Sequence, residues 1–331
     1  MASPMDAVFR QQIEQRHQRL QAAIAQGVDE PQVRRLLDEV DAALARLELG
    51  TFGICETCHD PIEEDRLRVD PLLRNCLDHL SSAEQRALER DLDLAGQIQG
   101  ALLPKGELSL GSWEAVCRYL PAGPVSGDCC DLLPSADRST MVFLVGDVAG
   151  KGVAASLLMA HLNATFRNLV ASALPLAEMM EKANTVFCNS VLSEHYATLA
   201  CGEARPGGRI DLCNGGHPPA IVLRRSGIEP LRATGLPLGM FCASTYRVER
   251  LTLDPGDGIF LYTDGLSEAT DASGTEYGAA RLGSFLEAHR RAAPGELIAA
   301  CLDDLKDFLG GRSRADDLTV MALRYGGSGA A

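Results

Sequence analysis

Four aspartates constrain the fold of this chain most, because each sits where an apolar run breaks into a turn or loop. Two of them closely follow strand-like runs, at 141–145 and 258–262. Acidic residues at strand ends can converge on one edge of a fold, where their carboxylates repel one another unless cations neutralise them. Hard oxygen ligands of this kind suit magnesium or manganese, so the pattern predicts a metal-dependent enzyme. The four residues are Asp128, Asp147, Asp264 and Asp316.

Composition and charge exclude several classes of protein. The 331 residues are 46% hydrophobic and 23% charged, which is ordinary for a soluble globular chain of two or three domains. A net charge of −14 disfavours nonspecific binding to nucleic acids or membranes. No apolar run approaches a membrane span, and the first residues lack the pattern of a signal peptide. We therefore expect a cytoplasmic protein without membrane or direct nucleic-acid partners.

The eleven cysteines do not form a disulfide framework by their spacing, since their number is odd and no secretory signal accompanies them. Three of them cluster between residues 55 and 76, and the others are scattered. We interpret the scattered ones as small buried hydrophobic residues, among them Cys117, Cys188, Cys201 and Cys301.

The N-terminal region predicts two helices, over 5–26 and 31–48. The second carries apolar residues at the spacing of one buried helical face, and Pro31 suits the first turn of a helix. The simplest arrangement is an antiparallel helical hairpin, and the alternative is two helices that pack elsewhere.

A Cys-x2-Cys pair and a Cys-x2-His pair follow, separated by 17 residues. Together they offer four nitrogen and sulfur ligands, which suit one structural Zn²⁺ in tetrahedral geometry. The alternative is a set of free thiols in a helical linker. His59 competes as a ligand, but its position next to a cysteine breaks the paired spacing. The predicted zinc ligands are Cys55, Cys58, Cys76 and His79.

Residues 83–103 predict a further helix with a coiled-coil-like seam, which is too short to be stable without a partner. That partner is either a second copy of the chain, giving a homodimer, or the domain that follows. The seam residues are Leu88, Leu92, Ala95, Ile98 and Leu102.

From residue 109 to 325, short β-rich runs alternate with glycine-rich turns and a few helices, which indicates a mixed α+β domain with much antiparallel sheet. The predicted strands are 114–119, 141–146, 197–203, 209–213, 219–224, 258–262 and 318–324. The predicted helices are 153–170, 176–192, 278–289 and 294–309.

This region resembles the bacterial PP2C-type serine/threonine phosphatases of the SpoIIE/RsbU group, and its motifs run in that family's order. The matching segments are 121–131, 146–152, 214–219, 236–239, 262–269 and 316–319, and the helix end at 97–104 resembles the family's linker. The resemblance implies a PP2C-like β-sandwich flanked by helices, with a two-metal site at one edge.

The resemblance also implies roles for individual residues. Asp147 would bridge two Mn²⁺ or Mg²⁺ ions, helped by the carbonyl of Val148, and Asp317 would take a supporting position. Water activated by the two metals would attack phosphorus, so that no protein nucleophile is needed. The other implied ligands are Asp128 on the second metal, and Asp264 and Asp316 on the first.

Several positions depart from the family pattern or leave their role open. Ser126 replaces a glycine and Pro124 replaces a commonly charged residue, so we expect an altered turn that keeps its metal ligand. Cys129 and Cys130 are interpreted as packing residues rather than nucleophiles. His217 is either a proton donor near the site or, as we favour, a structural histidine in its Gly-His-Pro turn.

The N-terminal third resembles the DksA/TraR zinc-finger proteins through residues 49–58 and the positions around Pro61, Pro71 and Cys76. His79 stands where that family usually has a fourth cysteine. Relatives with a long acidic-tipped hairpin act on RNA polymerase, which makes a contact with RNA polymerase an expectation here. Asp29 and Glu30 would form the tip.

These observations predict a hairpin and zinc finger over 1–82, a helical linker over 83–108, a phosphatase domain over 109–326 and a flexible tail over 327–331. The first functional hypothesis is a metal-dependent phosphatase acting on phosphoserine or phosphothreonine of a regulatory partner, a STAS-type anti-sigma-factor antagonist. The second is a transcription regulator that binds RNA polymerase through the zinc module. Retention of all four ligand aspartates favours the first.

Overall fold

The computed structural model describes residues 4–25, 31–80, 82–104, 106–190 and 195–327. The chain divides into two compact units, residues 1–91 and 92–331, and the division falls within helix α4 (Ser82–Leu102). The predicted acidic tip at Asp29 and Glu30 lies outside the described residues, as does the predicted tail from residue 328 on.

The first unit begins with the predicted antiparallel hairpin of α1 (Pro4–Ala25) and α2 (Pro31–Leu49). The rings of Phe9 and of Phe52, just beyond α2, contact each other with centroids 5.5 Å apart, whereas His17, later in α1, lies 2.9 Å from Asp41, earlier in α2. This opposite order shows that the two helices run antiparallel. A short helix α3 (Glu64–Val69) and a 3-10 turn η1 (Leu77–His79) complete the unit before α4.

The second unit is a sandwich of two antiparallel sheets, which confirms the predicted α+β architecture. One sheet has the order β1-β2-β11-β10-β7-β8, and the other has the order β3-β4-β5-β6-β9. Their bounds are β1 (Glu107–Leu110), β2 (Trp113–Leu120), β3 (Asp128–Pro134), β4 (Met141–Val148), β5 (Ala197–Arg205), β6 (Arg209–Gly215), β7 (Ala220–Arg224), β8 (Gly227–Leu231), β9 (Glu249–Thr252), β10 (Gly258–Tyr262) and β11 (Leu318–Tyr325).

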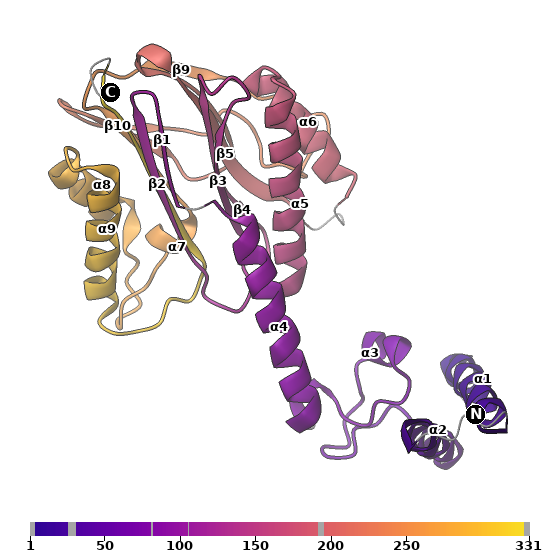
Figure 1. The fold of residues 1–331 in the computed structure, drawn as a ribbon. Helices are drawn as coiled ribbons and strands as arrows, with labels where there is room; N and C mark the ends of the chain where they lie inside the picture. The colour runs from indigo at the N-terminus through magenta and orange to yellow at the C-terminus, as the bar shows by residue number, and fades with distance from the viewer. Residues whose placement is uncertain (1–3, 26–30, 81, 105, 191–194, 328–331) are drawn as a thin grey trace. The chain divides into compact units, whose positions relative to one another are not determined.

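Helices cover the outer face of each sheet, on opposite sides of the sandwich (Figure 1). Helices α5 (Gly152–Ala171) and α6 (Leu176–Cys188) pack their apolar residues against the β3–β6 sheet. Helices α8 (Gly278–His289) and α9 (Pro294–Leu309) pack against the other sheet, after the single turn α7 (Asp264–Ser267). Because strands such as β4 are buried on both faces, β4 is continuously apolar from Met141 to Val145 rather than alternating.

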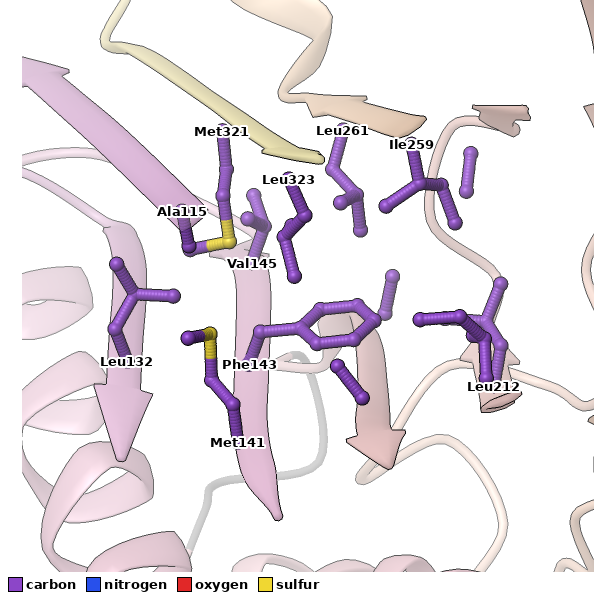
Figure 2. Close-up of a cluster of buried hydrophobic side chains, with 14 of the residues drawn as sticks. Ala115, Leu132, Met141, Phe143, Val145, Leu212, Ile259, Leu261, Met321 and Leu323 are labelled. Carbon is purple, nitrogen blue, oxygen red and sulfur yellow. The ribbon is translucent and has the colours of Figure 1, made fainter. Parts of the chain in front are cut away.

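The core lies between the two sheets (Figure 2). Phe143 at its centre is fully buried, and a side chain at Gly202 on the neighbouring strand would overlap its ring. The glycine in β5 is therefore explained by close packing rather than by backbone conformation. Other residues that meet here are Met141, Val145, Ile259, Leu261, Met321 and Leu323.

Four strands were not predicted from the sequence: β1, β3, β8 and β9. Most are short or lie at a sheet edge, where burial does not impose a clear apolar pattern. The interpretation of Cys188 as an isolated buried residue is wrong. This cysteine ends α6 and forms a disulfide with Cys242. Among the described helices, none is both long enough and apolar enough to cross a membrane.

Candidate active site and metal centre

Two of the predicted aspartates lie on neighbouring strands. Asp128 opens β3 and pairs in antiparallel register with Asp147 near the end of β4, which in turn pairs with Thr198 on β5. Residues directly opposite each other in a sheet point to the same face, so the two carboxylates are close neighbours. The other predicted aspartates reach the same edge from the second sheet.

Asp128 is held by two threonines from the opposite sheet. Its carboxylate is 1% exposed and accepts hydrogen bonds from the hydroxyls of Thr263 (2.9 Å) and Thr319 (2.7 Å). Burial raises the pKa of Asp128 well above its usual range, and the charge of Asp147 adds to this, while the hydroxyl of Thr319 acts in the opposite direction. The two threonines thus fix one carboxylate oxygen across the gap between the sheets.

Asp128 is one of five aspartates that we call the acidic edge. The other four are Asp147, Asp264, Asp316 and Asp317. Asp264 is the first residue of α7, and Asp316 precedes β11. Burial and then the charges of Asp264, Asp316 and Asp317 raise the pKa of Asp147 to about 7. Burial, followed by the charge of Asp316, raises the pKa of Asp264 as well. The carboxylates therefore repel one another, as expected where cations are to bind.

Asp317 supports the loop that precedes β3. One of its carboxylate oxygens accepts the backbone N–H of Ala122 at 2.8 Å, and the other accepts the N–H of Gly127 at 3.1 Å. Both oxygens are therefore used in holding the loop. On the other side, any side chain at Gly265 would overlap the carbonyl oxygen of Asp317, which brings α7 directly against this segment.

The turn before Asp128 is shaped by close approach and not by positive φ. Ser126, which was expected to alter this turn, does not adopt a positive φ, and its hydroxyl accepts the N–H of Asp128 at 3.1 Å. At Gly127, a Cβ would lie 2.9 Å from the carbonyl oxygen of Val148 and 3.3 Å from Oδ1 of Asp147. A glycine here leaves room beside two of the predicted metal-binding oxygens.

Helix α4 also contacts this turn. The side-chain amide of Gln99 accepts the N–H of Ser126 at 3.0 Å and donates to its carbonyl oxygen at 2.6 Å. A side chain at Gly96, one turn earlier, would overlap the carbonyl oxygen of Pro124. Ile98, on the predicted apolar seam of α4, is instead 58% exposed. The face of α4 that packs on this turn is therefore not the face that carries Ile98.

Lys151 provides a cation beside the acidic edge. Its ammonium lies 3.0 Å from Asp316 and 3.2 Å from the carbonyl oxygen of Ala315. Sequence reasoning missed Gln99, Lys151, Thr263 and Thr319. Three of these lie inside or next to the acidic motifs, so their proximity to the aspartates was the available signal.

Neither the histidine nor the cysteines near the site are suited to act as acids or nucleophiles. Burial lowers the pKa of His217 to about 3, and its Nδ1 lies 3.0 Å from the hydroxyl of Thr198. Its backbone N–H and carbonyl are both bound by the side chain of Asn214, as in a structural turn. Burial raises the pKa of Cys129 well above its usual range, and Cys130 beside it is equally buried.

The first unit contains a much tighter group of metal-binding side chains. The ligand atoms of Cys55, Cys58, Cys76 and His79 all lie within 4.8 Å of one another, whereas His59 is exposed and not part of the group. Burial acts to raise the pKa of Cys55, but hydrogen bonds from the backbone of Cys58 and Cys76 outweigh it and lower the pKa to about 6. Three thiols and one imidazole at this spacing fit Zn²⁺.

The acidic edge is more open. Within the described residues, the cysteine–histidine group is the one set of three or more such side chains that meets the 4.8 Å limit. The donors at the acidic edge are nevertheless all oxygens, and the space beside Gly127 adjoins the carbonyl of Val148 and the carboxylate of Asp147. This chemistry fits Mg²⁺ or Mn²⁺ and does not fit a thiophilic metal.

Comparison with known families agrees with both regions. The family model of stage II sporulation protein E (SpoIIE) matches residues 137–326, which is more than half of the chain. The chain belongs to the SpoIIE family. A second model, the prokaryotic DksA/TraR C4-type zinc finger, matches residues 50–78, although this chain has His79 as the fourth member of its group.

Individual relatives of this SpoIIE-family chain cover different parts of it. Protein IcfG of Synechocystis is 28% identical over 262 residues, which are 70% of this chain and 41% of IcfG. Phosphoserine phosphatase RsbP of Bacillus subtilis is 28% identical over 194 residues, which are 55% of this chain and 46% of RsbP. The chain thus spans less than half the length of either relative.

The solved SiaA-PP2C domain of Pseudomonas aeruginosa shares the fold. It superposes with a TM-score of 0.64 at 23% sequence identity, covering 74% of this chain and all of that domain (100%). This likeness confirms the predicted PP2C-like β-sandwich.

Proposed function

We propose that this chain is a metal-dependent protein serine/threonine phosphatase that hydrolyses phosphoserine or phosphothreonine on a regulatory partner protein. The observation that carries the proposal is the acidic edge, where Asp128 and Asp147 on paired strands of one sheet meet Asp264, Asp316 and Asp317 from segments next to strands of the other. Membership of the SpoIIE family and the name of the relative RsbP, a phosphoserine phosphatase, support the same activity.

In this proposal two Mn²⁺ or Mg²⁺ ions bind at the acidic edge. Asp147 and the carbonyl of Val148 would hold them, together with Asp128, Asp264 and Asp316. When bound, such ions acidify a water molecule for attack on phosphorus and neutralise the phosphoryl oxygens.

The remaining groups of the chain position these ligands. Thr263 and Thr319 hold Asp128 from the opposite sheet, and Asp317 holds the loop that leads to it. Lys151 contacts Asp316 and keeps a positive charge beside the acidic edge. Because His217 is buried with a pKa of about 3, it is neutral near pH 7 and serves the structure.

Hydrolysis of p-nitrophenyl phosphate and of a phosphoserine peptide, with and without manganese, tests this function. We expect turnover of both that depends on manganese and is abolished by EDTA. If neither compound is hydrolysed at saturating manganese, the proposal is contradicted. A purified STAS-type anti-sigma-factor antagonist in its phosphorylated form is the protein substrate to test next.

We further propose that Cys55, Cys58, Cys76 and His79 hold one structural Zn²⁺ and that the zinc module is a regulatory input to the phosphatase. The grouping of the four ligand atoms within 4.8 Å supports this. Metal analysis of the purified chain should give about one zinc per chain. Loss of zinc should then change manganese-dependent turnover, and an unchanged rate would exclude the regulatory part.

We propose that the chain forms a homodimer through residues 83–103. Leu88 and Ile98 on the predicted seam are 46% and 58% exposed, and Leu94 on the same helix is 55% exposed. Leu94 and Ile98, four residues apart, share one face of the helix, and exposed apolar side chains on one face favour a second helix as their cover. Sedimentation should give a dimer for the natural chain and a monomer for Leu88→Ser/Ile98→Ser. A monomeric natural chain at high concentration would contradict this.

A further inference from the structure

A cavity of about 490 Å³ lies beside the acidic edge and has no role in the function proposed above. It is enclosed by the C-terminal part of α9, the loop at 311–314 and the end of β2, and in Figure 1 this loop leads from α9 to β11. The walls are mainly apolar. They include Leu120, Leu302, Leu305, Leu309 and Leu318.

Three cationic side chains line the same cavity: Lys306, Arg312 and Arg314. The guanidinium of Arg314 donates to the carbonyl oxygens of Leu120 (2.6 Å) and Pro121 (3.3 Å), and Arg312 donates to the carbonyl oxygen of Asp271 (2.7 Å). These acceptors are neutral. In the part of the chain that the structure describes, none of the three cations forms an ion pair with a carboxylate. The cavity therefore presents three cationic side chains without an ion-pair partner among the described residues, on a chain whose net charge is −14.

The cavity is continuous with the acidic edge along the chain. Ala122 lines the cavity, and its backbone N–H donates to Asp317 at 2.8 Å. Ser313 and Arg314 line it from the other side and precede Asp316 by only a few residues. Since an extended chain advances about 3.3 Å per residue, one short peptide can reach both places.

We propose that this cavity docks the phosphoprotein substrate through an apolar side chain flanked by aspartate or glutamate residues, a few residues away from the phosphorylated serine or threonine. Leu120 and Leu302, which are partly exposed among the lining leucines, would contact the apolar side chain, and the three cations would pair with the acidic residues beside it. The net negative charge of this chain repels an acidic partner elsewhere on its surface. Lys306, Arg312 and Arg314 would therefore also select the orientation in which the partner binds. The role of the phosphorylated residue rests on the proposed function, whereas docking of the neighbouring segment is independent of it.

Binding of unphosphorylated, fluorescently labelled peptides to the full chain tests docking without requiring turnover. One peptide carries a leucine flanked by aspartates, a second replaces the leucine by serine, and a third replaces the aspartates by lysines. We expect the first to bind at least about tenfold more tightly than either of the others, measured by fluorescence anisotropy, and to weaken as salt is raised. Equal binding of the leucine and serine peptides would overturn the proposal, because the contact would then need charge only.

The variant Lys306→Glu/Arg312→Glu tests the location of the contact. It should weaken binding of the first peptide by about tenfold or more. Arg314 is left intact because it ties the loop to β2. The matched control is Arg232→Glu/Arg291→Glu, which makes the same change of net charge at two exposed positions outside the cavity. Equal weakening in both variants would overturn the proposal, since only the overall charge would then matter.

Phosphoserine versions of the peptides, with the leucine moved stepwise along the sequence, separate docking from catalysis. We expect kcat/KM for the best spacing, relative to p-nitrophenyl phosphate, to fall about tenfold in the cavity variant and to hold in the control. If the unphosphorylated peptide binds as expected but no phosphopeptide is hydrolysed, the proposed function fails and docking stands. If all phosphopeptides are hydrolysed equally well at every spacing, docking of the substrate fails and the phosphatase function stands.

Discussion

The two candidate metal sites differ in how the chain builds them. The cysteine–histidine group comes from residues 55–79 and is closed, with all four ligand atoms within 4.8 Å. The acidic edge collects its carboxylates from residues 128–317, out of both sheets, and is open. Structural zinc sites are closed, whereas catalytic sites keep room for water and substrate. The comparison shows that short-range spacing specifies a closed site, while an open one depends on the topology of the whole domain.

The largest expected effect separates the two sites by function. Asp147→Asn should lower manganese-dependent hydrolysis of p-nitrophenyl phosphate on the order of a thousandfold or more, because the residue is assigned to both metal ions. The zinc content should not change. Asp303→Asn, at an exposed position on α9, is the matched control and should retain the natural rate. Comparable rates for Asp147→Asn and the natural chain would refute the metal assignment.

The reverse experiment removes zinc and should leave the acidic edge itself assembled. Cys55→Ser should reduce the zinc content from about one per chain to near zero, since binding and folding of such modules are coupled. His79→Cys should retain zinc, because four thiolates are an equally competent set. Metal analysis and a thermal unfolding scan check both variants, with Cys301→Ser as a buried-cysteine control. Zinc retained in Cys55→Ser would show that the group is assigned wrongly.

A smaller effect should follow from filling the space beside the acidic edge. In Gly127→Ala the new Cβ would lie 2.9 Å from the carbonyl oxygen of Val148, so one of these groups must shift. We expect turnover to fall about ten- to a hundredfold, as small displacements of catalytic groups do. Gly123→Ala is the control in the same loop, because its Cβ would meet nothing nearer than 3.7 Å. Equal rates for the two variants would mean that the space beside Gly127 is not needed for turnover.

The smallest effect concerns the support of Asp128. Thr319→Val removes one of two hydroxyls that donate to its buried carboxylate, at nearly constant volume. The free energy of unfolding should fall by about 1–3 kcal/mol, the usual cost of an unsatisfied buried acceptor. Urea denaturation measures this, with Thr252→Val on β9, at an exposed position, as the comparison. No difference between the two variants would show that Thr319 does not support Asp128.

Much of this architecture could be predicted, for reasons that differ between the regions. The cysteine–histidine spacing and the apolar runs in β4, β10 and β11 are local signals that predicted these elements, whereas the β-sandwich followed from the resemblance to the phosphatase family. Strand β3 was missed because its sequence begins with an aspartate and ends with a proline, both poor strand formers. An altered turn was expected at Ser126, whereas the close backbone approach at Gly127 has no signature in one sequence.

Contacts between distant residues were the other part beyond prediction. The pairing of Cys188 with Cys242 spans 54 residues, and the hydrogen bonds from Thr263 and Thr319 to Asp128 join opposite sheets. The helix that carries Gln99 was expected to pack through its apolar seam residues. Instead Gln99, which is not a seam residue, is buried and contacts the turn before Asp128. Nothing in local periodicity distinguishes such an amide from an exposed one.

The pairing of β2 with β11 has a consequence for synthesis of the chain. Trp113–Leu120 and Leu318–Tyr325 are hydrogen-bonded neighbours, although some 200 residues lie between them. The segment carrying Asp316 and Asp317 can reach its place only when β11 has left the ribosome and joined the sheet. The zinc module needs only the first 80 or so residues. A nascent chain can thus complete the cysteine–histidine group long before the acidic edge, which is assembled last.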